Sequence, residues 1–443
     1  MSHDDCVAII GLGYVGLPLA VAFGRGRTTI GFDLNAQRVR ELHEGHDRNS
    51  ETTPQDLAAA ALLSFSHDEA DLARADVFII TVPTPVDEAK RPDLSFVLSA
   101  CRTIGRALKS RAAVRGTASK PTVVLESTVY PGCTELVCAP ALAASSGLRP
   151  GIDFRLGYSP ERINPGDSLH TLETVVKVIG ANDEETRNLL VDLYSQVAKR
   201  GVHCAPSIQV AEAAKVIENT QRDVNIALMN EFASLFERLG ITTGDVLAAA
   251  STKWNFLPFR PGLVGGHCVP EDPYYLKHRA EEVGYHMQLL ASARRINDSV
   301  PRQVAVRVVK QIALRGEPLL GTTVLVLGLT FKPDLRDFRN SRAVNVVREL
   351  QAYGLRVVVH DPYLRSAPAT VRGLGPAAGD ADKPTVSEPA AGIVICAAHR
   401  EYREMSRADL ESILATPEKP RVVFDCSGQV VPIELPNTRW MTL

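Results

Sequence analysis

The feature that most constrains the fold of this chain is a glycine-rich turn near its N-terminus. Residues 7–10 form a short apolar run that leads into the segment Gly11-Leu-Gly-Tyr-Val-Gly16, and an apolar helical pattern begins at Leu17. A first glycine suits a tight turn, a second lets a ligand approach the backbone, and a third lets the helix pack closely on the strand. The pattern predicts the opening strand, turn and helix of a parallel α/β sheet.

Other apolar runs indicate two such sheets. Near-continuous apolar strands separated by helical stretches are typical of a parallel sheet covered on both faces. We expect an α/β protein with two Rossmann-like doubly wound lobes, at residues 1–205 and 306–443. They are joined by a central helical domain at residues 206–305, which begins with a long connecting helix at about 206–239. The strands expected in the first lobe are 29–33, 77–82, 122–126 and 175–180, the last closing it, and those in the second are 323–328, 355–361, 392–396 and 422–425.

The glycine turn also predicts the ligand of the first lobe. The N-terminus of the helix after the turn suits a pyrophosphate. Asp33 follows Gly16 by 17 residues, where a carboxylate can accept hydrogen bonds from an adenosine ribose and would repel the extra phosphate of NADP, so NAD is expected. Arg38 is interpreted either as stacking on adenine or as a solvated helix residue. The expected cofactor contacts are Gly11, Gly13, Tyr14, Val15, Gly16, Asp33 and Arg38.

Composition and charge limit the partners. The chain has 443 residues, of which 45% are hydrophobic and 23% charged, and its formal net charge of -2 offers no field for nucleic acid or an anionic membrane. No apolar run approaches the roughly 20 residues that a membrane span needs. We therefore expect a cytoplasmic protein whose partners are small molecules or copies of itself. Because the eight cysteines lack Cys-x-x-Cys spacing, neither a disulfide framework nor a metal site is expected.

One cysteine has surroundings that suit chemistry. Cys268 lies in Gly265-Gly-His-Cys-Val-Pro-Glu-Asp272, where two glycines let the backbone approach a ligand and place N–H groups near a developing oxyanion. A thiolate can add to an aldehyde, and the resulting thiohemiacetal can lose a hydride to give a thioester. Asp272 can turn back toward the thiol and orient water. The alternatives are a buried small residue for Cys268 and a helix N-cap for Asp272.

A second pair of polar residues lies on the long helix. Lys215 and Asn219 are four residues apart and so project from one face. Together they can stabilise an oxyanion, and a lysine of lowered pKa can accept the proton of an alcohol. The alternative is an ordinary helix surface on which Glu212, Glu218 and Arg222 form exposed ion pairs.

Read together, these segments resemble the UDP-glucose/GDP-mannose dehydrogenase family, which oxidises a nucleotide sugar at C6 with two NAD per turnover. The resemblance covers nearly the whole chain. It is carried by residues 11–16, Val82-Pro-Thr-Pro85, Glu126-Ser-Thr-Val129, Tyr158-Ser-Pro-Glu-Arg-Ile-Asn-Pro-Gly166, Ala211-Glu-Ala-Ala-Lys-Val-Ile-Glu-Asn219, Gly265-Gly-His-Cys268 and Gly328-Leu-Thr-Phe-Lys332.

The resemblance assigns roles to residues of this chain. It implies that Cys268 is the nucleophile, that Lys215 and Asn219 hold the oxyanion, and that Asp272 and Thr128 position water. Glu161 would handle a proton or water, and Thr84 and Thr128 would border the nicotinamide. The substrate contacts that it implies are Glu161, Arg162, Lys215, Asn219, Phe259, Arg260, Gly265, Lys332 and Arg339.

The same resemblance makes the last lobe the UDP-binding domain. Gly328 stands without a second dinucleotide fingerprint, whereas Lys332 and Arg339 can pair with a diphosphate. The alternative for these two residues is a solvated basic loop beside Asp334 and Asp337.

Which sugar is oxidised is predicted from local sequence. Residues 160–166 and 254–268 resemble the bacterial branch that acts on UDP-N-acetylhexosamines, UDP-GlcNAc or UDP-GalNAc, in surface-polysaccharide synthesis, while Pro270-Glu271 departs from it. The alternatives are a UDP-glucose or UDP-ManNAc 6-dehydrogenase, a two-electron hydroxyacid dehydrogenase in which Cys268 merely packs, and a non-catalytic nucleotide-sugar sensor. A homodimer through the long helix is expected.

Overall fold

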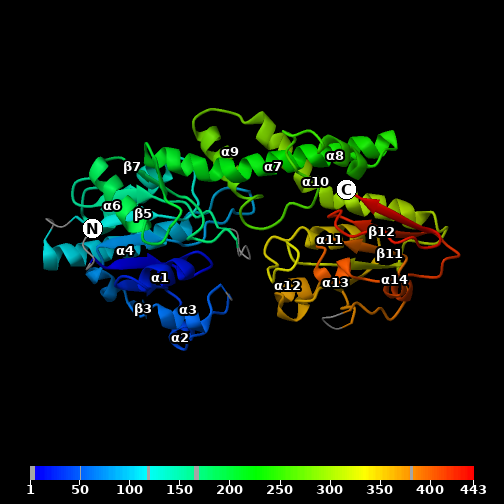
Figure 1. Cartoon of the computed structure of the whole chain (residues 1–443), viewed down its shortest axis with the longest axis horizontal. Helices are drawn as coiled ribbons and strands as arrows, with labels where there is room; N and C mark the ends of the chain where they lie inside the picture. Colours follow the sequence, from blue (N-terminus) through cyan, green and yellow to red (C-terminus); the bar gives the residue numbers. More distant parts are fainter. Residues whose placement is uncertain (1–4, 50, 117–119, 164–168, 380–382) are drawn as a thin grey trace. The chain divides into compact units, whose positions relative to one another are not determined.

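The computed structural model describes residues 5–49, 51–116, 120–163, 169–379 and 383–443 (Figure 1). The chain forms two compact units. One comprises residues 1–218 and 274–286, and the other comprises residues 219–273 and 287–443. The expected division into three domains at 205 and 305 stays a prediction.

The first unit is built on an eight-stranded sheet in the order β3-β2-β1-β4-β5-β6-β7-β8. Neighbouring strands are parallel except for β6 and β7, which are antiparallel. The expectation that residues 175–180 close the sheet is wrong, because β8 pairs with β7 on its outer side. The strands are β1 (Val7–Ile10), β2 (Thr29–Phe32), β3 (Leu63–Ser66), β4 (Val77–Ile80), β5 (Thr122–Leu125), β6 (Arg155–Tyr158), β7 (Lys177–Ala181) and β8 (Val202–Ala205).

Both faces of this sheet are buried, as continuous apolar strands require. Ala8 and Ile10 point into one apolar cluster, and Val7 and Ile9 point into another on the opposite face. Helices supply the other side of each cluster. They are α1 (Gly16–Gly24), α2 (Ala36–His43), α3 (Pro54–Ala59), α4 (Ser95–Arg115), the π-helical turn Thr134–Cys138, α5 (Ala139–Ser146) and α6 (Glu184–Tyr194).

The long helix predicted at 206–239 is α7 (Ile208–Leu239), with 32 residues. It is followed by α8 (Thr243–Ala250), by the loop that carries Cys268, by α9 (Asp272–Glu282) and by α10 (Gln288–Ala313). The central part of the chain is therefore helical, as expected. No helix among the described residues is both long and apolar enough to span a membrane, and the cytoplasmic location stays a prediction.

The last lobe, within the second unit, has a parallel five-stranded sheet in the order β10-β9-β11-β12-β13. Val324 and Val326 of its first strand enter one apolar cluster, and Leu325 and Leu327 enter another. The predicted α/β fold class is thus confirmed. The elements are β9 (Thr323–Leu327), α11 (Ala343–Ala352), β10 (Arg356–His360), α12 (Ala369–Arg372), β11 (Gly392–Ile395), α13 (Arg400–Arg403), α14 (Arg407–Ile413), β12 (Arg421–Asp425) and β13 (Thr438–Thr442).

Candidate active site

The three glycines of the N-terminal turn meet three different steric demands. Gly11 has φ +100°, which favours glycine. A Cβ at Gly16 would lie 1.8 Å from the carbonyl oxygen of Gly11 and 2.4 Å from Oγ1 of Thr81, so α1 packs against the turn itself. A Cβ at Gly13 would meet nothing within 4 Å, so this side of the turn is open for a ligand.

Asp33 stands at the end of β2 and faces this turn. Its Oδ2 accepts a hydrogen bond of 2.9 Å from the backbone N–H of Leu12, and its Oδ1 accepts one of 2.9 Å from that of Asn35. The carboxylate is half-buried. Tyr14 and Val15, also half-buried, complete the turn before α1. The residues present therefore fit a dinucleotide whose pyrophosphate approaches Gly13 and whose ribose approaches Asp33.

The environment of Arg38 decides against one of its two interpretations. It is 5% exposed, so the solvated helix residue is wrong. Its Nε donates a hydrogen bond of 3.0 Å to the carbonyl oxygen of Leu12, and its guanidinium lies 2.7 Å from the carboxylate of Asp47. Arg38 thus stabilises the glycine turn through the carbonyl of Leu12, and its stacking on adenine stays a prediction.

The loop that carries Cys268 packs against the loop that follows β9. The N–H of Gly266 donates 3.3 Å to the carbonyl of Asn340, and Nδ2 of Asn340 returns a bond of 2.9 Å to the carbonyl of Gly266. Nε of Arg342 donates 3.1 Å to the carbonyl of Val264. At Gly265 a Cβ would lie 2.9 Å from the carbonyl oxygen of Asn340, so glycine permits this close approach.

Cys268 itself is exposed, so the alternative of a buried small residue is wrong. Five of the other cysteines are buried: Cys6, Cys101, Cys133, Cys138 and Cys426. A reactive thiol must be accessible to its substrate, and the exposure of Cys268 meets that condition.

The side chains of Asp272 and Asn219 are hydrogen-bonded to each other in the second unit, and Asp272 lies four residues after Cys268. The N–H of Asp272 donates 2.9 Å to the carbonyl of Cys268, so the chain turns back within one helical turn, as expected. Asp272 is 3% exposed and is the first residue of α9. Its Oδ2 accepts 2.6 Å from Nδ2 of Asn219. The carboxylate is therefore oriented by α7.

Lys215 lies one turn before Asn219 on α7, in the first unit, and is 7% exposed. Its neighbour Glu212 is 0% exposed and accepts hydrogen bonds from Gly132 and Thr134, so the interpretation of Glu212 as a surface ion-pair residue is wrong. Glu218 does form an ion pair, with Arg162 at 2.8 Å.

The remaining residues predicted in the first unit follow its strands. Thr84 and Thr128 are half-buried, and the carbonyl of Thr84 accepts 2.8 Å from the hydroxyl of Tyr275. Oε1 of Glu161 accepts from the N–H groups of Arg162 and Ile163, the latter at 2.7 Å, so its carboxylate shapes its own loop. Residues 164–166 of this motif lie outside the described residues.

A buried polar cluster beside Thr128 was missed by the sequence analysis. Oε2 of Glu126 accepts 2.9 Å from Nζ of Lys177, and Oε1 accepts a short hydrogen bond from the hydroxyl of Tyr194. Burial raises the pKa of Glu126. A lysine at the start of an apolar strand is the one sequence signal that pointed to it.

In the last lobe, Lys332 and Arg339 are both exposed. Arg339 is held by Asp337, with an NH2–Oδ2 distance of 2.6 Å. The same carboxylate lies 3.5 Å from Nε2 of His267, next to the cysteine. Asp337 therefore pairs with the predicted diphosphate-binding arginine and lies near His267 of the cysteine loop, while burial lowers the pKa of His267. Phe259 is half-buried and Arg260 exposed in the loop after α8.

The turn after β9 copies that after β1 in one respect. Gly328 has φ +80°, and Oδ2 of Asp361, just after β10, accepts from the N–H groups of Leu329 at 2.6 Å and Thr330 at 3.1 Å. His399 completes the corner. Its Nδ1 accepts 2.9 Å from the N–H of Asp334, so its Nε2 carries the proton, and it lies 3.2 Å from Asp361.

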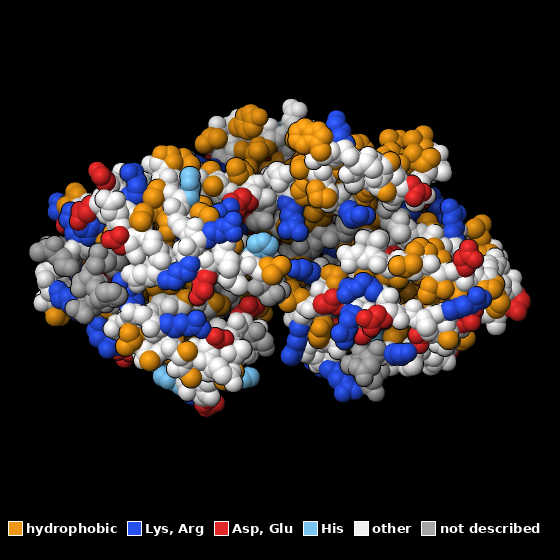
Figure 2. All heavy atoms as spheres, in the orientation of Figure 1, with side chains coloured by type: hydrophobic (Ala, Val, Ile, Leu, Met, Phe, Trp, Pro, Cys, Tyr) orange, Lys and Arg blue, Asp and Glu red, His pale blue; other side chains and the backbone are white. Residues whose placement is uncertain are grey.

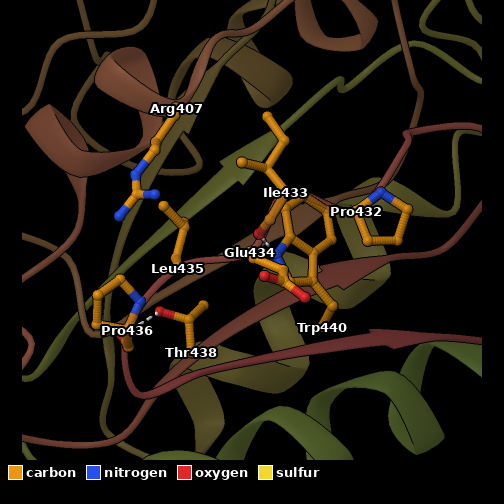
Figure 3. Close-up of a pocket in the computed structure, with 8 residues that line it drawn as sticks. All are labelled: Arg407, Pro432, Ile433, Glu434, Leu435, Pro436, Thr438 and Trp440. Atoms are coloured by element: carbon orange, nitrogen blue, oxygen red, sulfur yellow. Dashed lines mark hydrogen bonds between the residues drawn. The ribbon is translucent and has the colours of Figure 1, made fainter.

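A separate surface cavity of about 520 Å³ lies in the last lobe, beside β13. Figure 3 shows Arg407, Leu435 and Pro436 toward the left of the cavity, and Trp440 and Pro432 toward the right. It is lined by none of the predicted site residues, so the candidate site rests on hydrogen-bond geometry and not on this hollow.

Comparison with known proteins bears on the whole chain. Models of the UDP-glucose/GDP-mannose dehydrogenase family match residues 5–198 as its NAD binding domain, 209–299 as its central domain and 325–432 as its UDP binding domain. The UDP-N-acetyl-D-glucosamine 6-dehydrogenase of Pseudomonas aeruginosa is 47% identical over 93% of this chain and 94% of the relative. That of Salmonella typhi is 43% identical over 98% of both.

A solved structure is similar over the same extent. The UDP-D-ManNAc dehydrogenase of Pyrococcus horikoshii superimposes with a TM-score of 0.85 at 29% identity, covering 99% of this chain and 98% of that one.

Proposed function

Because this chain belongs to the UDP-glucose/GDP-mannose dehydrogenase family, we propose that it oxidises the C6 hydroxyl of UDP-GlcNAc to a carboxylate with NAD, as a step toward surface polysaccharide. It is an NAD-dependent dehydrogenase of UDP-sugars. The observation that carries the choice of sugar is the 47% identity, over nearly the full length of both chains, to a relative named for UDP-GlcNAc. UDP-GalNAc is the nearest alternative, followed by UDP-ManNAc and UDP-glucose.

NAD would be held by Gly11, Gly13, Gly16 and Asp33, and two NAD molecules bound in succession would each accept one hydride. Two N–H groups on the Asp33 carboxylate fix its orientation before any ligand arrives. Thr84 and Thr128 would border the nicotinamide. The hydroxyl of Tyr275 holds the backbone at Thr84, so that border is supported by α9.

The first oxidation needs a base for the C6 hydroxyl proton. Lys215, 7% exposed on α7, is the residue that we assign to it, with its ammonium form or Asn219 stabilising negative charge on the oxygen. Glu161 would act on water or a proton beside it.

Cys268 would then add to the C6 aldehyde. Its thiolate sulfur forms a bond to carbon, and the aldehyde oxygen takes a proton to give a thiohemiacetal. Loss of the second hydride to a second NAD, together with release of the hydroxyl proton to solvent, would leave a thioester on Cys268. The exposure of the thiol and the hydrogen bonds that hold Gly266 to Asn340 support this role.

Water must cleave the thioester, and Asp272 is placed to direct it. Its carboxylate is oriented by the amide of Asn219 at 2.6 Å and follows Cys268 by one helical turn. Attack of water on the thioester carbon releases the sugar carboxylate and regenerates the thiolate, with Asp272 orienting or deprotonating the water.

The UDP moiety would be bound by the last lobe. Lys332 and Arg339 are exposed cations, and Arg339 would exchange part of its pairing with Asp337 for the diphosphate. Arg162, Phe259, Arg260 and Gly265 are proposed to contact the sugar or nucleotide.

A second copy of the chain is the proposed partner of α7. Leu228, Phe232, Leu235 and Leu239 are 41%, 37%, 48% and 61% exposed and recur at helical spacing on one stripe. Figure 2 shows hydrophobic side chains gathered where α7 and α8 lie in Figure 1. Sedimentation of Phe232→Glu should give monomer where the wild type gives dimer, and a dimer in both would refute this interface.

The function is tested by incubating purified protein and NAD with each of four sugars and measuring the NADH formed per sugar. The sugars are UDP-GlcNAc, UDP-GalNAc, UDP-ManNAc and UDP-glucose. We expect two NADH per UDP-GlcNAc and the highest kcat/KM with that sugar. One NADH per sugar would favour the two-electron alternative, and NADH from none of the four would refute the function. Cys268→Ser should abolish the second NADH, whereas Cys204→Ser, at another exposed thiol, is the matched control.

A further inference from the structure

Glu212 has no role in the reaction proposed above, yet it is one of the two fully buried acids on α7, the other being Asp223. Its side chain is 0% exposed, and its carboxylate accepts three hydrogen bonds. Oε2 accepts from the N–H of Gly132, while Oε1 accepts from the N–H of Thr134 at 2.8 Å and from its Oγ1 at 2.7 Å. All three donors belong to one short stretch of chain about 80 residues away in sequence.

That stretch is the turn that follows β5. It begins after Leu125, the last residue of β5, and includes Thr128, which is proposed to border the nicotinamide. It enters the π-helical turn at Thr134. Gly132 has φ +93°, so the turn is tight, and a carboxylate at the start of the following helix is favoured by the helix dipole. Glu212 thus holds the N-terminal end of this helical segment.

The other end of the connection is α7. Glu212 precedes Lys215 by three residues, which is one turn of the same helix. The carboxylate therefore joins, through one side chain, the turn that carries Thr128 and the helix that carries Lys215.

The arrangement is not what stability alone would select. Burial raises the pKa of Glu212 to about 7, so the ionised carboxylate is disfavoured by its surroundings while the three donors favour it. An apolar residue with a differently capped turn would avoid that conflict.

We infer that Glu212 is a positioning residue, which fixes the turn from Thr128 to Thr134 against the helix segment of Lys215 and so sets the geometry of the first oxidation. The inference deepens the proposed function and rests on it. Glu212 does not touch substrate or cofactor; it acts through Thr128 and Lys215.

The experiment compares Glu212→Gln with Glu231→Gln, an exposed glutamate on the same helix, as the matched control. Gln keeps the shape but presents an NH₂ group to a backbone donor. Amide hydrogen exchange at residues 130–134 should rise roughly tenfold in Glu212→Gln and stay unchanged in the control. The kcat for UDP-GlcNAc should fall at least about tenfold while KM changes less than about threefold.

Thr134→Val provides a milder variant that removes only the Oγ1 bond, in case Glu212→Gln folds poorly. It should raise exchange in the same segment and lower kcat by smaller factors. The inference is overturned if exchange stays within about twofold of wild type, if exchange rises without loss of kcat, or if kcat falls equally in the control. Wild-type protein inactive on every sugar would refute the function instead, and the exchange arm would still decide the Glu212 contact.

Discussion

Nδ2 of Asn219 lies 2.6 Å from Oδ2 of Asp272, so the amide of one helix orients the carboxylate that begins another. The family resemblance implies separate tasks for these residues, oxyanion binding for Asn219 and water positioning for Asp272. The hydrogen bond makes the tasks interdependent, because Asn219 cannot turn toward a substrate oxygen without altering the environment of Asp272. Replacing either should affect the release of product.

Replacing Asn219 with Ala should slow turnover by about 10- to 100-fold. The variant loses an oxyanion donor and also removes this donor from the nearly buried carboxylate of Asp272. Steady-state NADH formation measures the effect. Asn225→Ala, on the same helix with its amide bonded to the carbonyl of Gln221, is the control and should retain most activity. Equal losses in both variants would show that only the helix was damaged.

Replacing Asp272 with Asn should trap the thioester. The neutral amide cannot take a proton from water, so hydrolysis should become slower than both oxidations and about two NADH should form per enzyme in a burst. Mass spectrometry of the quenched protein should find the acyl adduct on the peptide that contains Cys268. A normal steady state with no adduct would remove Asp272 from the hydrolytic step.

Replacing Asn340 with Ala should loosen the cysteine loop. The variant loses the 2.9 Å bond to the carbonyl of Gly266, although the backbone carbonyl of residue 340 is kept. We expect the rate at which iodoacetamide alkylates Cys268 to differ at least about twofold from that of the wild type. The kcat should fall about tenfold, while the affinity for NAD stays unchanged. Unaltered alkylation and kcat would mean that the loop is held by its other contacts, such as Arg342.

Replacing Asp33 with Asn should relax the preference for NAD. The amide oxygen can still accept from Leu12, but the charge that repels a 2′-phosphate is gone. The ratio of kcat/KM for NADP to that for NAD should rise at least about tenfold. An unchanged ratio would show that another group excludes NADP.

Glu212→Gln should also change the pH dependence of stability. Because the folded-state pKa of Glu212 is raised to about 7, its contribution favours folding below its unfolded pKa and is lost as pH rises through 7. The wild type should therefore lose up to about 3 kcal/mol relative to Glu212→Gln between pH 4.5 and 8, since one pKa unit corresponds to roughly 1.4 kcal/mol.

Urea unfolding at several pH values measures this difference. Nearby charged or titratable groups are Glu135, which raises the pKa, Cys138, Lys215 on the same helix, and Arg279 near Gly132. A difference that does not vary with pH would mean that Glu212 titrates near its ordinary pKa.

The sequence was sufficient for the elements whose pattern is local. Strand β1, the glycine turn and α1 follow from apolar periodicity and from steric demands on Gly11 and Gly16, and α7 follows from a long run without helix breakers. The strand β8 was missed because residues 202–205 alternate only weakly, and its place outside β7 is set by pairing with that strand.

The candidate site was predictable in its residue types but not in its contacts. Cys268, Lys215, Asn219 and Asp272 carry recognisable chemistry at recognisable spacing. Glu212 and Asn340 do not, because their roles depend on segments about 80 and 74 residues away that only folding brings to them. The solvated interpretation of Arg38 is wrong because its partner Asp47 lies beyond the helix that carries it, whereas its stacking on adenine stays a prediction.

Asp33 and Asp361 are counterparts in the two sheets, each following the strand beside the first one and each bound by the N–H that comes after the turn glycine. Each also receives an N–H from two residues further on. At Asp361, however, Thr330 and the imidazole of His399 add two more donors. The Asp33 carboxylate keeps lone pairs that can accept from a ligand hydroxyl. The Asp361 carboxylate accepts four hydrogen bonds from the protein and holds the structure of its own lobe. The two lobes thus share this turn but differ in whether its aspartate can bind a ligand. Altering one aspartate should leave the nucleotide preference of the other lobe intact.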